Sequence, residues 1–305
     1  MTTNEPTRPA WVDSEIFPFE SRWVVIDGHT VHYIDEGPKN GQAILFLHPA
    51  PGWSFSYRNQ IIELRKNFRC IAPDFPGYGL SKSREGYNYT LQEQSQFLER
   101  FVEVLKLKDM IIWANDGGGP TAILALSHHT DLVKGLVVGG TFGWSLKDYP
   151  SVTRMLRLFS SGFFQAFNRY TNMLPRSLTM FGLGVKSLTE KERLHYMMPF
   201  KDRKSRNHPL KLFRTFIDSS TEEKLNLSLP AFHNKSILIQ FGEKDPMTKQ
   251  GWQNRWATEI PNSRVDLIPK VKHFTFEDAP EITTRNFLDW WKDQKSLLNK
   301  EISWS

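Results

Sequence analysis

The sequence predicts an α/β protein built on a mostly parallel β-sheet that helices cover on both faces. Short, continuous apolar runs alternate with amphipathic helical segments along the chain. Most of these runs lack polar–apolar alternation, which is typical of strands that are buried on both faces. One long stretch, residues 146–228, breaks this rhythm with helical periodicity and no convincing strand. With 305 residues, 39% of them hydrophobic, the chain can form one large core that carries such an insertion.

The predicted elements follow one another in an order that fits this sheet. Residues 22–37 hold two β-branched, aromatic-rich runs around Asp27-Gly28, which predict an antiparallel hairpin. Further strands are predicted, in chain order, at 42–48, 68–75, 109–115, 133–142, 236–245 and 264–273. Helices are predicted between them at 56–67, at 90–108 with Thr90 as the N-cap, and at 119–129.

Residues 146–228 are expected to form a helical cap that is inserted into a core domain made of residues 1–145 and 229–305. Three helices are predicted in it, at 151–170, 189–198 and 209–219. Ligands of open α/β sheets bind at the carboxyl ends of the strands, where this cap would lie. Because the cap is rich in Phe, Leu and Met, the expected ligand is a small apolar organic molecule.

Composition narrows the expected partners and compartment. The net charge is +6, but the basic residues are dispersed except in residues 200–211, which we interpret as a solvated surface, so no nucleic-acid partner is expected. No 18-residue apolar run or apolar leader is present, so neither a membrane span nor a signal peptide is expected. Cys70 is the single cysteine and is predicted to be inert core. We expect a cytoplasmic monomer or weak homo-oligomer without cofactor or metal.

Asp116 stands where a buried strand meets a helix. Ala114 lies two places before it, and Gly118 and Gly119 lie two and three places after it. Small residues at these positions are typical of a nucleophile elbow, because a larger side chain would collide with the adjacent strand or helix. The nucleophile position holds a carboxylate here, so Asp116 is either a nucleophile or only the N-cap of the helix.

Two later strand ends carry the remaining members of a possible triad. Asp245 closes the run at 236–245, and His273 follows the last strand. Each residue alone could be an ordinary loop residue. Together with Asp116 they give the chain order nucleophile, acid, histidine that is typical of α/β-hydrolases. No histidine pair with an intervening glutamate predicts a metal site.

The motifs around these residues resemble the α/β-hydrolase superfamily, and within it the haloalkane dehalogenase and epoxide hydrolase branch. The resemblance spans residues 20–292 and rests on "LHPAPGWSFSYR", "PDFPGYGLSK", "DGGGPTA", "FGEKDPM", "VKHFTFEDAP" and the cap-like "LTEKERLHYMMPF". It implies the α/β-hydrolase fold with a cap. It also implies that Asp116 forms an alkyl ester and that His273, oriented by Asp245, activates the water that cleaves this ester. By the family pattern, the backbone N–H groups of Ala50 and Gly117 form the oxyanion hole.

The sequence departs from the dehalogenase pattern where the halide would be held. Those enzymes place a Trp directly after the nucleophile, and this chain has Gly117 there. Ala50 offers no side-chain donor at the second halide position. Trp144 is a candidate indole donor or a packing residue, and Phe164 stands in the cap where a Trp would help. Loss of one donor to a developing anion costs roughly 3–4 kcal/mol.

Three functions therefore stay open. The favoured one is a haloalkane dehalogenase-like hydrolase that acts on a small apolar substrate. The first alternative is an epoxide hydrolase with Tyr170 and Tyr196 as cap acids, unless these tyrosines are structural. The second is a non-catalytic small-molecule binder on the same scaffold. An indole N–H that faces Asp116 would favour a halide, paired tyrosine hydroxyls an epoxide, and a cavity filled by side chains the binder.

Overall fold

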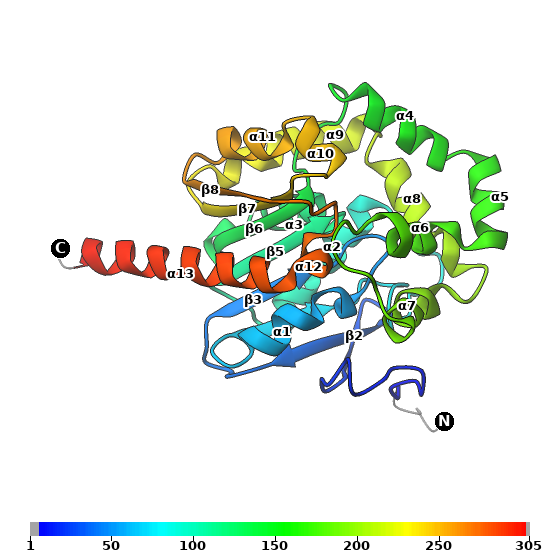
Figure 1. Ribbon diagram of the computed structural model, residues 1–305, viewed down its shortest axis with the longest axis horizontal. Helices are drawn as coiled ribbons and strands as arrows, with labels where there is room; N and C mark the ends of the chain where they lie inside the picture. The colour runs from blue at the N-terminus through cyan, green and yellow to red at the C-terminus, as the bar shows by residue number, and fades with distance from the viewer. Residues whose placement is uncertain (1–5, 303–305) are drawn as a thin grey trace.

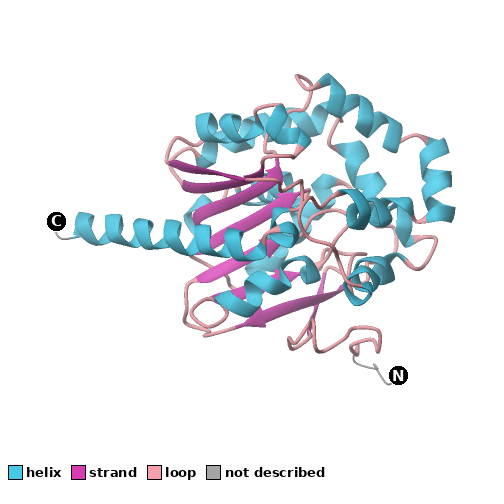
Figure 2. Ribbon diagram, in the orientation of Figure 1, coloured by secondary structure: helices cyan, strands magenta, loops and turns pink. Residues whose placement is uncertain are grey.

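The structure, a computed structural model, describes residues 6–302 and is built around one eight-stranded sheet (Figures 1 and 2). The first and last few residues of the predicted core domain, 1–5 and 303–305, lie outside the described residues. The strands are β1 (Arg22–Ile26), β2 (His29–Glu36), β3 (Ala43–Leu47), β4 (Arg69–Pro73), β5 (Met110–Asp116), β6 (Val133–Thr141), β7 (Ser236–Gly242) and β8 (Ser263–Ile268).

The strand order across the sheet is β1-β2-β4-β3-β5-β6-β7-β8. β2 pairs antiparallel with both β1 and β4, and the other neighbouring pairs are parallel. The predicted mostly parallel sheet is confirmed. Strands β3 and β5 to β7 therefore end at the same edge, and the loops that follow them can meet there.

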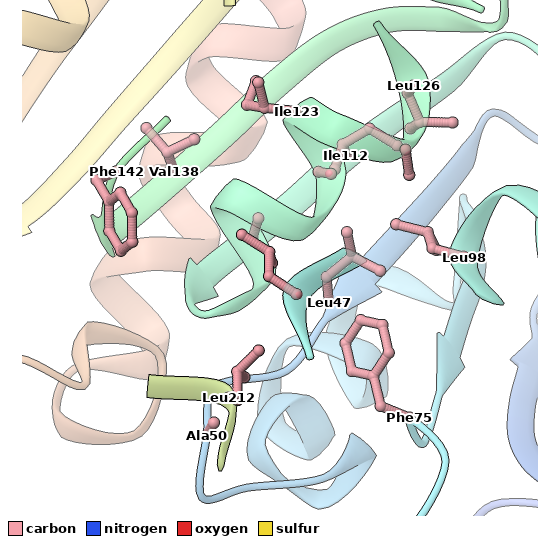
Figure 3. Close-up of a cluster of buried hydrophobic side chains, with 14 of the residues drawn as sticks. Leu47, Ala50, Phe75, Leu98, Ile112, Ile123, Leu126, Val138, Phe142 and Leu212 are labelled. Atoms are coloured by element: carbon pink, nitrogen blue, oxygen red, sulfur yellow. The ribbon is translucent and has the colours of Figure 1, made fainter. Parts of the chain in front are cut away.

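Helices cover both faces of the sheet (Figure 2). On one side lie α1 (Arg58–Leu64), α12 (Thr275–Asp278) and α13 (Pro280–Ile302), and on the other lie α2 (Leu91–Val104), α3 (Gly118–Leu126) and α11 (Trp252–Glu259). Each face of the sheet buries its own cluster of hydrophobic side chains. Along β5, Ile111 and Trp113 belong to the first cluster, under α1 and α13, whereas Ile112 and Ala114 belong to the second cluster, under α2 and α3. Figure 3 shows part of the second cluster. This two-sided burial explains why the strands are continuous apolar runs in the sequence.

Two local structures, a hairpin turn and a helix N-cap, form where the sequence predicts them. The hairpin turns at Asp27 and Gly28 with φ of +48° and +82°, the left-handed geometry that glycine and aspartate tolerate best. Helix α2 begins after Thr90, whose hydroxyl accepts a hydrogen bond from the Glu93 N–H at 3.2 Å, while the Glu93 carboxylate accepts one from the Thr90 N–H.

Residues 146–228 contain only helices and loops, and most of these helices lie beyond the ends of the strands (Figure 1). The longer helices are α4 (Pro150–Phe159), α5 (Gly162–Thr171), α6 (Met173–Phe181), α7 (Glu190–Met197), α8 (His208–Thr215) and α9 (Ser219–Ser228). The prediction of one helix over 151–170 is wrong. Ser161 ends it by accepting a hydrogen bond from the Phe164 N–H, which makes Ser161 the N-cap of a new helix, α5.

Among residues 6–302, no helix is long and apolar enough to cross a membrane. Cys70 is buried in β4, and burial raises the pKa of its thiol, which fits the predicted inert core residue.

Candidate active site

Asp116 ends β5 in a strained backbone conformation that its neighbours hold in place. Its φ is +48°, a value that residues other than glycine rarely adopt. The hydroxyl of Thr141, on the neighbouring strand, donates a hydrogen bond to the Asp116 carbonyl at 2.5 Å. A Cβ on Gly118 would lie 2.5 Å from the Leu47 carbonyl oxygen, and one on Gly119 would lie 2.0 Å from the Thr141 hydroxyl. The predicted sharp elbow therefore requires glycine at both positions.

The Asp116 carboxylate has a different neighbour at each oxygen. The Ala50 N–H donates a hydrogen bond to Oδ2 at 2.8 Å. His273 Nε2 lies 3.7 Å from Oδ1, which is beyond hydrogen-bond length. One oxygen is thus fixed by the backbone, while the other faces the imidazole without a backbone donor.

His273 and Asp245 form the second pair of the site. His273 Nδ1 donates a hydrogen bond to Asp245 Oδ2 at 3.1 Å. Asp245 is fully buried and follows β7 as the N-cap of α10 (Pro246–Lys249), where its Oδ1 accepts a hydrogen bond from the Met247 N–H at 2.9 Å. Gly140 makes room for the imidazole, because a Cβ there would lie 2.9 Å from His273 Nδ1. The structure brings the three predicted triad residues together.

The charges around His273 favour its protonated form. Burial lowers the pKa of His273, but the carboxylates of Asp245 and Asp116 outweigh burial and raise this pKa to about 10. The imidazolium that this site stabilises is the species that a general base becomes when it takes a proton.

Hydrocarbon occupies the space beside Gly117. A Cβ on Gly117 would lie 3.2 Å from Leu212 Cδ2 and 3.4 Å from Phe216 Cζ, and 3.9 Å from the Ala50 Cβ. Figure 3 shows Leu212 beside Ala50. Leu212 belongs to α8, and Phe216 directly follows it. Leu212 and Phe216, from α8 and the residue after it, therefore fill the region that a Trp at position 117 would enter.

A cavity of about 590 Å³ opens onto the triad. Its walls combine the strand-end loops with cap helices α4, α6 and α8, and they are mainly hydrocarbon. The described lining includes Ala50, Pro51, Asp116, Phe142, Val152, Met155, Leu156, Phe159, Leu174, Leu178, Phe213, Phe216, Lys244, Asp245, Trp252, Lys272, His273 and Phe274. An apolar cavity with a few convergent polar groups at one end is the usual form of a small-molecule site.

The side chains that the sequence suggested as substrate contacts do not line this cavity. Trp144 is buried and packs edge-on against Trp252 and Trp256, with ring centres 5.9 and 5.1 Å apart. Phe164 stacks behind Phe159 at 4.7 Å, so Phe159 takes the position at the wall. Of the two roles open to Trp144, indole donor or packing residue, its position fits packing, and Phe164 also packs behind the cavity wall.

The two cap tyrosines are also directed elsewhere. Tyr170 is 67% exposed on the outside of α5, where the Arg203 guanidinium lies 4.9 Å from its ring centre. Tyr196 is buried, and its hydroxyl donates a hydrogen bond to Glu277 at 2.5 Å. Neither ring is part of the cavity wall, so the paired hydroxyls that an epoxide reaction would use are not formed by these residues.

Sequence reasoning missed the residues that shape the wall. Phe213 and Phe216 are three positions apart in "PLKLFRTFIDS", a helical spacing that could have marked them as one inward face. Trp252 lines the cavity with its ring, while its Nε1 is buried without a hydrogen-bond partner among the described residues. No sequence pattern distinguishes this tryptophan from the others.

Comparisons with known proteins agree with this geometry. A family model described as the alpha/beta hydrolase fold matches residues 42–280. The chain is 30% identical to haloalkane dehalogenase 2 of Mycobacterium bovis over 272 residues, which is 88% of this chain and 94% of that protein. It is 26% identical to the cis-3-alkyl-4-alkyloxetan-2-one decarboxylase of Shewanella oneidensis, over 93% of this chain and 92% of that protein.

Among solved structures, haloalkane dehalogenase DbeA from Bradyrhizobium elkani matches with a TM-score of 0.83 and 22% identity. The match covers 92% of this chain and 99% of that chain. At this identity, the similarity is one of fold.

Proposed function

The chain belongs to the α/β-hydrolase fold family and is a haloalkane dehalogenase-like hydrolase, and from this we propose that Asp116 is the nucleophile that cleaves a carbon–halogen bond in a small apolar substrate. One observation carries the proposal. The Asp116 carboxylate opens into an apolar cavity, with Oδ2 bound by the Ala50 N–H at 2.8 Å and Oδ1 3.7 Å from His273 Nε2.

The first step is a displacement at saturated carbon. Oδ1 of Asp116, which lacks a backbone donor, attacks the carbon in line with the leaving group, and the halide departs with the bonding electron pair. The product is an alkyl ester of Asp116. Because this ester carries no charge, one of the two carboxylates that held the proton on His273 is neutralised, and His273 releases this proton to solvent before the second step.

The second step is hydrolysis of that ester. His273 takes a proton from water, the resulting hydroxide attacks the Asp116 carboxyl carbon, and Asp245 stabilises the imidazolium. The negative charge that develops on Oδ2 is already next to the Ala50 N–H, and the Gly117 N–H is the second donor of the proposed oxyanion hole. Collapse of this intermediate breaks its bond to the alkoxide, which takes the remaining proton of the attacking hydroxide and leaves as the alcohol, and this restores the Asp116 carboxylate while His273 keeps the other proton.

The helical segment 146–228 serves this reaction as the cap. Its side chains form most of the hydrocarbon wall around the reacting carbon. A small apolar organic substrate fits this wall. We further propose that the protein works as a cytoplasmic monomer or weak homo-oligomer, without a nucleic-acid or membrane partner.

A strained cyclic ester is a second candidate substrate. The relative from Shewanella oneidensis is named for its action on dialkyl oxetanones. The hydrocarbon that Leu212 and Phe216 place beside Gly117 favours such a compound, since ring strain lowers the demand for groups that stabilise a departing ion. The epoxide hydrolase alternative has less support, because Tyr170 and Tyr196 lie away from the cavity.

The test is the intact mass of the His273→Phe variant after incubation with bromoalkanes, chloroalkanes, epoxides and a dialkyl oxetanone. We expect an alkyl adduct from a bromoalkane, because the first step does not need the base and the second does. The double variant Asp116→Ala, His273→Phe is the control and should stay unmodified. An adduct from only an epoxide or an oxetanone would replace the haloalkane proposal. Absence of any adduct on a folded protein would reject Asp116 as nucleophile.

A further inference from the structure

A second concave site lies at the other edge of the sheet. Its volume is about 870 Å³. It is formed where strands begin: Ala43 and Arg69 are the first residues of β3 and β4, Asp109 directly precedes β5, and Lys134 is the second residue of β6. In a parallel sheet, this edge is opposite to the one that carries Asp116. The hollow is therefore separate from the proposed active site and does not depend on it.

Six basic side chains line this hollow against a single lining carboxylate, that of Asp109. They are Lys39, Arg69, Lys106, Lys108, Lys134 and Lys295, and we call this site the basic hollow. They come from five separate stretches of chain, so the sequence shows them only as dispersed charge. The fold collects them on one surface, where their combined potential attracts anions.

Most of these basic side chains form no ion pair within the described residues. Asp35 pairs with Arg69 at 2.9 Å and with Lys39 at 2.8 Å. The other four lysines form no ion pair with any carboxylate among residues 6–296, the part of the chain whose side chains the structure describes. Four ammonium groups around one hollow repel one another, and a bound anion would remove this repulsion.

Trp291 adds a buried wall to the basic hollow. It is 6% exposed, and the ammonium groups of Lys134 and Lys295 lie 5.5 and 5.6 Å from its ring centre. Its Nε1 is buried and has no hydrogen-bond partner among the described residues. The indole thus brings two lysines from distant segments, β6 and α13, to one place by cation–π attraction.

We propose that the basic hollow binds a small polyphosphate anion. Lysine ammonium groups are compact point charges that bind phosphate oxygens well, and several of them match an anion with several charged oxygens. The concave shape favours a small ligand over a flat lipid surface. The basic side chains surround one hollow and do not follow a stripe, which favours a small ligand over an extended nucleic acid.

The experiment is calorimetric titration of the full chain with tripolyphosphate at low ionic strength, repeated with added sodium chloride. We expect saturable binding that weakens as salt rises. The variant Lys106→Gln, Lys134→Gln should bind at least about tenfold more weakly, because it loses two of the unpaired charges. The control variant Lys201→Gln, Lys204→Gln removes the same charge from exposed cap positions and should bind like the unchanged protein.

Three results would overturn the proposal. One is no saturable binding of tripolyphosphate by the unchanged chain. Another is equally weakened tripolyphosphate binding in both double variants, which would show that binding depends only on the net charge of the protein. The third is binding of phosphatidylglycerol vesicles, but not tripolyphosphate, through Lys106 and Lys134, which would identify a membrane-docking surface. Both variants change exposed residues, and circular dichroism checks that each is folded.

Discussion

At the scale of single residues, the proposed reaction depends on how His273 shares its proton with two carboxylates. Asp245 lies 3.1 Å from one ring nitrogen and Asp116 lies 3.7 Å from the other. In the free protein both carboxylates hold the imidazole protonated. Formation of an ester on Asp116 removes one of them and so lowers the pKa of His273, which lets the imidazole release its proton and become available as the base of the second step.

We therefore expect the hydrolysis of the ester to rise with pH through an apparent pKa below the value of about 10 that His273 has in the free protein. Single-turnover release of alcohol from the alkylated protein across pH 6 to 11 measures it, with the pKa of free His273 followed by nuclear magnetic resonance. Asp245→Asn should lower the pKa of free His273, since the Asp245 charge is the largest cause that raises it. Equal pKa values for the free and alkylated protein would contradict this account.

The same shift predicts a dependence of stability on pH. The pKa of His273 is raised in the folded state, so protonated His273 stabilises the fold fully below its unfolded pKa of about 6.5, and this contribution is lost as pH rises to about 10. The free energy of unfolding of the unchanged protein, relative to that of His273→Phe, should therefore fall between pH 6.5 and 10. Urea unfolding of both proteins at several pH values measures this difference in the free energy of unfolding. A difference that stays constant or rises with pH would show that the folded protein does not raise the pKa of His273.

At the scale of elements, helix α8 decides what surrounds the nucleophile. Leu212 on α8 and Phe216 just after it are in van der Waals contact with the position of a Cβ on Gly117. A tryptophan at 117 and this placement of α8 exclude one another. The absence of an indole at position 117 and the inward direction of Leu212 and Phe216 thus belong together. In this arrangement, hydrocarbon lies where a tryptophan N–H could donate a hydrogen bond.

This arrangement predicts that Gly117→Trp alone destabilises the protein by roughly 1–3 kcal/mol through overpacking and does not improve chloroalkane turnover. In the triple variant with Leu212→Ala and Phe216→Ala, the indole has space and can donate to the departing chloride. Turnover of a chloroalkane should then exceed that of Leu212→Ala, Phe216→Ala by at least about tenfold. Chloride release and thermal unfolding measure both effects. Faster chloride release by Gly117→Trp alone, at unchanged stability, would show that α8 does not compete for this space.

A second element-scale feature joins the cap to the core. Arg58 on α1 is 2% exposed and forms ion pairs with Glu192 on α7 at 2.6 Å and with Glu277 on α12 at 2.5 Å. Glu277 also accepts the hydrogen bond of Tyr196. The buried arginine therefore holds a cap helix against the segment that follows His273.

Arg58→Met should lower the free energy of unfolding by up to about 3–5 kcal/mol, because two carboxylates lose their buried cation. Lys186, which pairs with Glu192 at 2.9 Å and with Glu277 at 2.7 Å, offsets part of this loss. The matched control is Arg100→Met, which removes an exposed arginine that pairs with Glu103 on the surface and should change stability by about 0–1 kcal/mol. Urea unfolding compares the two. Equal losses of unfolding free energy in both variants would mean that the buried ion pairs of Arg58 stabilise the fold no more than a surface ion pair does.

The sequence predicts the elements of the core better than the contacts of the cap. Strands such as β3 are continuous apolar runs because both faces are buried, and Asp116, Asp245 and His273 can be located because they follow such runs. The direction of a cap side chain depends instead on how short helices pack. Sequence patterns therefore do not separate cavity residues from packing residues. Trp144 and Tyr196 are candidates for either role and pack away from the cavity, while Phe213 and Phe216 line it. The basic hollow is formed only by tertiary structure, because its lysines are distant in sequence.

At the scale of the whole molecule, the two edges of the sheet have opposite chemical character. The edge where strands end carries an apolar cavity of about 590 Å³ with the triad, and the edge where they begin carries the basic hollow of about 870 Å³. Substrate specificity is thus expected mainly from apolar burial, since Leu212 and Phe216 place hydrocarbon beside Gly117 and most of the cavity wall is hydrocarbon.

Two consequences follow for the choice of haloalkane. A chloride ion is small and strongly hydrated, so its release beside Leu212 and Phe216 is more costly than release of bromide or iodide. We expect kcat/KM for 1-bromohexane to exceed that for 1-chlorohexane by at least about 10²-fold, the effect of one missing anion donor. The value for bromoalkanes should also rise from two to six carbons, because each buried CH₂ contributes about 0.8 kcal/mol, or roughly fourfold. Halide release across both series measures these ratios, with Phe213→Ala as the variant that should flatten the chain-length dependence. Equal turnover of chloroalkanes and bromoalkanes would show that a group other than Leu212 and Phe216 receives the departing halide, for which Lys244 and Lys272 are the cations in the described lining. A flat chain-length series in the unchanged protein would show that the cavity does not hold the alkyl chain.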